Sequence, residues 1–105
     1  MWETLFKGKE LDDNTIRDVT VGGVPLLVAK VNGKIYVSDL YCTHEQTSLS
    51  EGFIEGCNIV CSAHFASFNL KDGKVVSGPE GESGPIKNLN VYNTKVEDGM
   101  IMVEL

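Results

Sequence analysis

Two short stretches of the chain each place one cysteine and one histidine within four residues. Cys42 and His44 open the stretch CTHEQTSLSEG, Cys61 and His64 lie in CSAHFASF, and 16 residues separate His44 from Cys61. The chain of 105 residues has no other histidine. Thiolate and imidazole groups are ligands of zinc and of iron-sulfur clusters, so the two stretches together predict a metal site with two sulfur and two nitrogen ligands.

The spacing of these residues distinguishes two kinds of site. Zinc would take two thiolates and two imidazoles in a tetrahedron around one ion, but structural zinc sites usually begin with two cysteines, and the first pair here is a cysteine and a histidine. A 2Fe-2S cluster divides such a set, with both thiolates on one iron and both imidazoles on the other, and needs two opposed loops. The arrangement favours iron and sulfide. Cys57, the third cysteine, is expected to be a plain thiol in or beside a strand.

The two stretches interrupt a series of short β-strands. Short apolar segments, most of them alternating, predict strands at residues 15–21, 25–31, 34–39, 58–62, 74–78 and 100–105. Turn dipeptides ending in glycine separate them, and Asn32-Gly33 marks the clearest hairpin. No segment shows three turns of helical periodicity. The fold class is therefore all-β, a small antiparallel β-sandwich or barrel, with functional loops expected at 42–52, 62–68 and 77–85.

Composition limits the classes of partner. The hydrophobic fraction of 42% and the charged fraction of 23% are typical of a globular protein, and the length predicts a single domain over residues 1–105. The formal charge of −6 argues against nucleic acid. No apolar run is long enough to cross a membrane and the first residues do not read as a signal peptide, so we expect a cytoplasmic protein. A small carrier of this kind is expected to be a monomer.

The two motifs resemble those of the Rieske iron-sulfur proteins, in which Cys-x-His is followed after about 15 to 17 residues by Cys-x-x-His. The segments SLSEG, GPEGESGP and YNTKVEDGMIMVEL are similar to those of the small Rieske-type ferredoxins of bacterial multicomponent oxygenases. The resemblance implies one Rieske 2Fe-2S cluster, with Cys42 and Cys61 on the inner iron and His44 and His64 on the outer iron. It also implies a cluster-binding subdomain of two loops, at about residues 40–84, on a β-sandwich base.

The chain departs from this family at three loop positions. Proline commonly follows each cysteine and glycine follows the second histidine, whereas this chain has Thr43, Ser62 and Phe65. None of the three is a ligand. A phenylalanine in place of glycine either avoids a positive φ or carries strain. The family also has a Gly-Pro loop over the cluster, for which Gly78-Pro79 is the expected counterpart.

The positions around the cluster predict a low reduction potential. Respiratory Rieske proteins have a disulfide and two hydroxyl donors to the cluster sulfurs, and the corresponding places here hold Thr47, Ala63, Ala66 and Phe68. Hydrogen bonds to the sulfurs stabilise the reduced form, so their loss lowers the potential. We expect a potential near the low end of the Rieske range, about −150 mV, with little dependence on pH near neutrality.

The resemblance implies an electron carrier and not an enzyme. It would pass single electrons from a flavin-dependent NAD(P)H ferredoxin reductase to a terminal aromatic-ring dioxygenase, with His44 and His64 as the exit and with Phe65 and Pro79 as an apolar docking patch. A Rieske oxygenase needs two further histidines for a mononuclear iron, and none remains. The alternatives are the ferredoxin of a diiron toluene-type monooxygenase, the small subunit of an assimilatory nitrite reductase, and a zinc-stabilised module.

Overall fold

The computed structural model describes residues 1–43, 47–79, 81 and 86–105. Eleven strands and two single-turn 3-10 helices occur in these ranges. The strands are β1 (Trp2–Lys7), β2 (Thr15–Val21), β3 (Val24–Val31), β4 (Lys34–Asp39), β5 (Phe53–Glu55), β6 (Asn58–Val60), β7 (Ser67–Asn69), β8 (Val75–Ser77), β9 (Val91–Tyr92), β10 (Thr94–Glu97) and β11 (Met100–Glu104). The 3-10 helices are η1 (Gly8–Glu10) and η2 (Leu49–Glu51). No α-helix occurs in the described ranges, and none of their helical turns could span a bilayer. The all-β prediction is confirmed.

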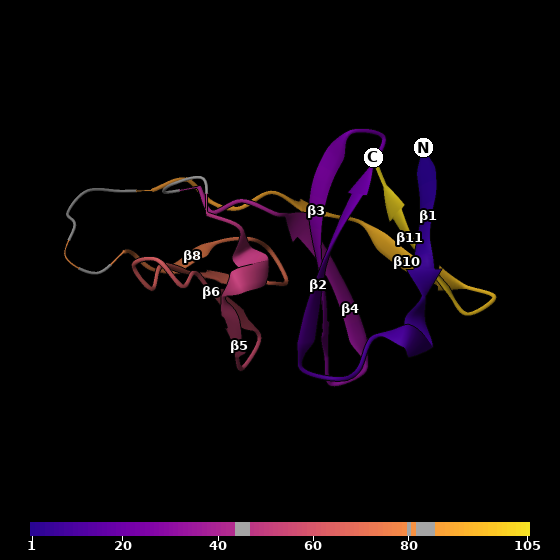
Figure 1. Ribbon diagram of the computed structural model, residues 1–105, viewed down its shortest axis with the longest axis horizontal. Helices are drawn as coiled ribbons and strands as arrows, with labels where there is room; N and C mark the ends of the chain where they lie inside the picture. Colours follow the sequence, from indigo (N-terminus) through magenta and orange to yellow (C-terminus); the bar gives the residue numbers. More distant parts are fainter. Residues whose placement is uncertain (44–46, 80, 82–85) are drawn as a thin grey trace.

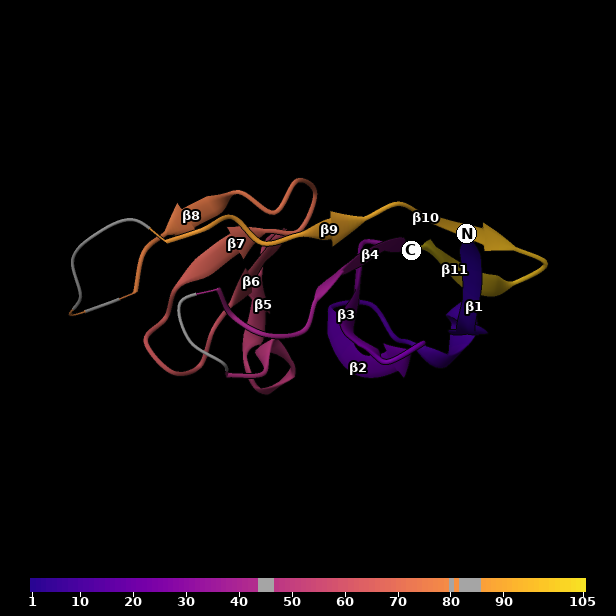
Figure 2. The same ribbon diagram turned by 90° about the horizontal axis from the view of Figure 1, so that it is seen from above.

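The strands form three antiparallel sheets. Two of them, β1-β11-β10 and β2-β3-β4-β9, pack on one core and make the base of the molecule. The third sheet, β5-β6-β7-β8, lies on the other side of β3, towards the opposite end of the long axis (Figure 1). The molecule is elongated, with extents of 45 × 26 × 20 Å, and β9 runs back from the third sheet to the base (Figure 2).

Strand β3 joins the two halves of the molecule because both of its faces are buried. Leu26 and Val28 point into the core of the base, whereas Leu27, Ala29 and Val31 point into a second core shared with the third sheet. A strand covered on both faces has no need of alternating polarity. This explains the continuous apolar run PLLVA in the sequence.

Local sequence signals located some strands and missed others. The segments 15–21 and 34–39 are strands with the predicted bounds. Asn32 and Gly33 have φ of 51° and 79°, the positive values that a type I′ hairpin turn requires. The predicted strand 58–62 ends at Val60, because the chain there turns into the second cysteine loop. Strands that the patterns did not predict are β1, β5, β7, β9 and β10.

Candidate metal centre

The first cysteine loop begins where β4 ends, at Asp39. The backbone N–H of Cys42 donates to the carbonyl of Thr47 over 3.0 Å, and the N–H of Leu49 donates to the carbonyl of Leu40 over 2.7 Å. These two bonds close the loop at its base as a continuation of antiparallel pairing. The backbone of Cys42 is therefore held in place by its own loop.

The second cysteine loop is closed in the same way. It joins β6 to β7, and the N–H of Cys61 donates to the carbonyl of Ala66 over 2.8 Å. Both cysteines thus bond to the carbonyl five residues later, since Cys42 bonds to Thr47. A further bond runs from the Phe65 N–H to the Cys61 carbonyl, over 3.0 Å. Two loops of like closure, each starting at a cysteine, are the arrangement that the paired motifs predicted.

The two cysteines belong to one core. Cys42 and Cys61 are 4% and 1% exposed, and both pack in the cluster of buried residues between β3 and the third sheet. His64 is half-buried and its Nδ1 atom is buried. Two buried sulfur atoms and a buried imidazole nitrogen fit the donor set of an iron-sulfur cluster.

Three of the four predicted ligands lie among the described residues. His44, the fourth predicted ligand, is outside the described residues. Among the described residues no three Cys, His, Asp or Glu side chains are grouped closely enough to hold a metal ion. The assignment of four ligands therefore stays a prediction.

Cys57 has different surroundings. It is half-buried, takes part in no disulfide and hydrogen-bonds to the phenol of Tyr36. Burial is the main cause of a raised pKa of Tyr36, and the contact with Cys57 adds to it. The Cys57 thiol thus contacts a residue of β4, and its predicted non-ligand role stays a prediction.

A polar clamp anchors the connection between base and loops. Asp39, the last residue of β4, accepts hydrogen bonds from the phenol of Tyr92 on β9 and, over 2.9 Å, from the side-chain amide of Asn90. Burial, and then the bond to Asp39, raise the pKa of Tyr92 to about 12. The clamp ties the chain segment that enters the first loop to the segment that returns to the base. Sequence reasoning missed it, because the partners are 51 and 53 residues apart and no local pattern relates them.

Two residues of the first loop region have roles that the structure explains. The hydroxyl of Thr43, which replaces the usual proline, donates to the carbonyl of Lys87 over 2.6 Å and so ties this loop to the returning segment. Gly52, at the end of SLSEG, lies against β6. A Cβ atom there would come within 1.9 Å of the Val60 carbonyl oxygen, so only glycine permits this approach.

The position after His64 shows the predicted conflict. Phe65 has a φ of 61°, in the left-handed region where a residue with a Cβ is strained. Its side chain is 48% exposed. Pro79, by contrast, is buried. The prediction of an apolar docking patch made by Phe65 and Pro79 is therefore wrong for Pro79. Phe53, which is 45% exposed, instead shares with Phe65 the lining of a shallow pocket of about 270 Å³.

Comparison with known proteins identifies the family. Residues 1–93 match the Rieske [2Fe-2S] domain. The chain belongs to the Rieske family. It is 32% identical over 104 residues to the ferredoxin component of the naphthalene 1,2-dioxygenase system of Pseudomonas putida, covering 99% of this chain and 95% of that one. It is 33% identical to ferredoxin CarAc of Metapseudomonas resinovorans, over 98% and 92% of the two chains.

Solved structures agree with this assignment. The ferredoxin-sized chain in a complex of reduced oxygenase and oxidized ferredoxin of carbazole 1,9a-dioxygenase superposes with a TM-score of 0.86 at 32% identity, over 97% of this Rieske chain and all of that chain. The Sphingomonas yanoikuyae B1 ferredoxin has a TM-score of 0.89 at 24% identity, over 100% and 99% of the two chains, and supports the fold. This Rieske protein carries a 2Fe-2S cluster, and it is a ferredoxin of the ring-hydroxylating dioxygenase type, an electron-transfer component and not a catalytic one.

Proposed function

We propose that this Rieske ferredoxin holds its cluster through Cys42, Cys61, His44 and His64, and carries single electrons from a flavin-dependent NAD(P)H reductase to a terminal aromatic-ring dioxygenase. The observation that carries the ligand assignment is the like closure of the two cysteine loops, each with a buried cysteine at its start. The cluster supplies the one-electron chemistry. The chain supplies the ligands, excludes water from the thiolates and presents a surface to the partners. The whole chain is then one Rieske domain, with the cluster-binding subdomain at about residues 40–84.

The side chains at the two hydroxyl positions support a low potential. Ala66 and Phe68 are both buried, and neither has a side-chain donor. A sulfur of the cluster would therefore receive no hydroxyl hydrogen bond from these positions. The proposed reduction potential is therefore about −150 mV, since hydrogen bonding to the sulfurs is one of the main determinants of the potential.

The surface beside the second loop fits a redox partner. Phe53 and Phe65 are exposed aromatic residues that line one pocket together with Glu55. Aromatic residues are enriched at protein interfaces, and the negative net charge favours a partner with a basic rim. A related ferredoxin forms a complex with its oxygenase. We place the docking surface for the terminal oxygenase here. A monomeric carrier in the cytoplasm would meet both partners by diffusion.

The first experiment is an electron paramagnetic resonance spectrum of the dithionite-reduced protein, recorded with its visible spectrum as isolated. We expect a coloured protein with the rhombic signal of a cluster that has two nitrogen ligands. His64→Ala is expected to abolish this signal, while Asn58→Ala, a half-buried control outside the loops, is expected to retain it. A colourless protein that contains zinc would refute the proposal, and so would a normal signal in His64→Ala.

Ala66→Ser tests the account of the potential. A hydroxyl at this buried position would donate to the cluster and stabilise the reduced form, so the potential is expected to rise. Protein-film voltammetry measures the change. A wild-type potential above about +100 mV, in the upper half of the Rieske range, would refute the low-potential proposal without affecting the ligand assignment.

A further inference from the structure

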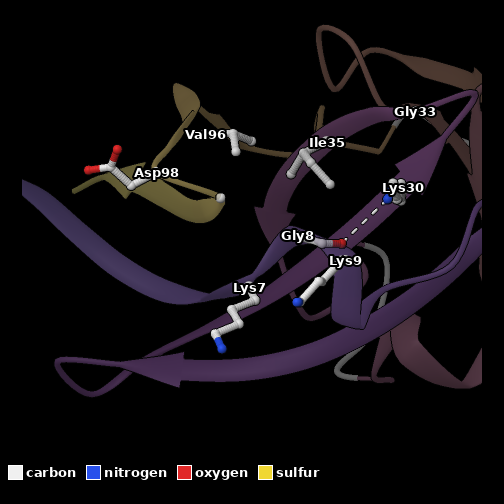
Figure 3. A pocket seen from close by; sticks show the side chains of 9 residues that line it. Lys7, Gly8, Lys9, Lys30, Gly33, Ile35, Val96 and Asp98 are labelled. Atoms are coloured by element: carbon white, nitrogen blue, oxygen red, sulfur yellow. Dashed lines mark hydrogen bonds between the residues drawn. The ribbon is translucent and has the colours of Figure 1, made fainter.

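The base of the molecule contains a pocket of about 470 Å³ that the electron-transfer function does not use (Figure 3). It lies at the end of the sandwich where η1, the β3-β4 turn and the β10-β11 hairpin meet, on the side of β3 away from the third sheet. Its volume is within the range of small-molecule sites. Three chain segments remote in sequence form its wall.

The charge of the pocket opposes the charge of the protein. Lys7, Lys9 and Lys30 line it against a single acid, Asp98, although the chain carries a net charge of −6. The ion pair recorded among the described residues joins Lys95 to Glu97. No ion pair in the described ranges involves Lys7, Lys9 or Lys30. The Glu10 carboxylate accepts a hydrogen bond from the backbone N–H of Lys7 over 3.3 Å, so two carboxylates stand near three ammonium groups. Like charges held together in this way attract an anion.

Lys30 is the residue that makes the pocket unusual. It alternates with Leu26 and Val28 on the face of β3 that points between the two base sheets, and it is half-buried. Its ammonium group donates to the carbonyl of Gly8 over 3.4 Å (Figure 3). An ammonium group has three N–H donors, so two remain for a ligand in the pocket. A charged group on the inner face of a sandwich costs free energy unless it is paired.

The opposite wall is held in a fixed shape. The N–H of Gly8 donates to the carbonyl of Gly99 over 2.9 Å, which fastens η1 to the β10-β11 hairpin. Pairing of β1 with β11 shifts register between Thr4 and Lys7, so β1 has one extra residue there. Such a bulge changes the face to which the following side chain points. The bulge therefore sets the direction of Lys7 at the pocket.

The remaining lining is apolar. Ile35 on β4 is half-buried, and Val96 on β10 is 56% exposed, with its side chain at the pocket (Figure 3). Apolar groups beside fixed cations suit a ligand that is itself part apolar and part anionic. We propose that the pocket binds a small organic carboxylate, with the carboxylate near Lys9 and Lys30 and a compact apolar group, such as an aromatic ring, against Ile35 and Val96.

The test is a titration of the isotope-labelled holoprotein with sodium benzoate, followed by amide chemical shifts. The elements that line the pocket belong to the base, at the end of the molecule opposite the third sheet (Figure 1), so their amide signals are expected to escape the paramagnetic broadening near the cluster. We expect benzoate to shift the amides of Lys9, Gly33 and Gly99 saturably, and acetate and benzyl alcohol to bind at least about tenfold more weakly, since each lacks one half of the recognised chemistry.

Matched variants distinguish binding in the pocket from general attraction of benzoate to positive charge. Lys9→Gln changes an exposed residue and is expected to weaken benzoate binding by about threefold to tenfold. Lys74→Gln, which changes an exposed residue directly before β8 of the third sheet, is expected to leave binding unchanged. The proposal is overturned if benzoate shifts none of these amides, if acetate binds as well as benzoate, or if the two variants weaken binding equally.

Discussion

The left-handed backbone of Phe65 can be tested by asking which of two substitutions, to glycine or to alanine, gives the more stable protein. Phe65 has a φ of 61° and stands beside His64 in the second cysteine loop. For a residue with a Cβ atom this conformation costs about 1 to 2 kcal/mol. Glycine escapes that cost, but it loses about 0.4 to 1 kcal/mol because its unfolded chain has more conformational freedom.

The comparison is made between Phe65→Gly and Phe65→Ala. Both variants lose the ring, which is 48% exposed, so the loss of packing cancels between them. The difference that remains is the backbone strain of alanine less the extra unfolded-state entropy of glycine. The central values of the two effects favour glycine by about 0.8 kcal/mol. At an ordinary position the order is reversed, with alanine the more stable of the two. Ala63→Gly provides that ordinary position in the same loop, because Ala63 is exposed and is absent from the residues with positive φ.

The assay is thermal unfolding of the holoproteins at one scan rate, followed by circular dichroism and by the visible absorption of the cluster. For a domain of this size, Phe65→Gly is expected to melt about 3 to 5 °C above Phe65→Ala. Ala63→Gly is expected to melt below the wild type by a similar amount. The reasoning about strain is refuted if Phe65→Ala melts at the same temperature as Phe65→Gly or above it.

Three further substitutions test the clamp, a close backbone contact and the ligand assignment. Tyr92→Phe breaks the clamp to Asp39 and is expected to cost about 1.5 to 3 kcal/mol in the free energy of unfolding at pH 8, measured in guanidinium. Because the folded pKa of Tyr92, about 12, lies above the usual 10, its contribution is complete below pH 10 and is lost as the pH rises from 10 to 12. The variant should therefore show a shallower fall in stability over that range, and an unchanged fall would contradict this. Gly73→Ala would bring a Cβ within 1.9 Å of the Leu89 carbonyl oxygen at a φ of 78°, so we expect a loss of more than about 3 kcal/mol, seen as a lower melting temperature; a wild-type value would show that the contact can relax. Cys57→Ser is expected to leave the visible and paramagnetic spectra unchanged, and bleaching would overturn the ligand assignment.

The sequence determined the chemistry of this protein and its local turns. Two cysteines and two histidines in the order Cys-x-His and Cys-x-x-His indicate a 2Fe-2S cluster, because ligand type and spacing are properties of the chain itself. Asn32-Gly33 became a hairpin because the φ values of a turn depend on two adjacent residues. The left-handed conformation of Phe65 was one of two outcomes left open by sequence.

The tertiary structure decided everything that depends on residues far apart in the chain. Strands such as β5 and β9 are too short to have a pattern of their own, and they exist because neighbouring strands supply their hydrogen bonds. Pro79 is buried, although it stands in a polar loop sequence. The clamp of Asp39 and Tyr92 and the lysine pocket of the base likewise bring together segments that no local signal relates. Sequence specifies which groups are present and how adjacent residues turn, whereas long-range packing decides which of these groups meet, which are buried and which face a partner.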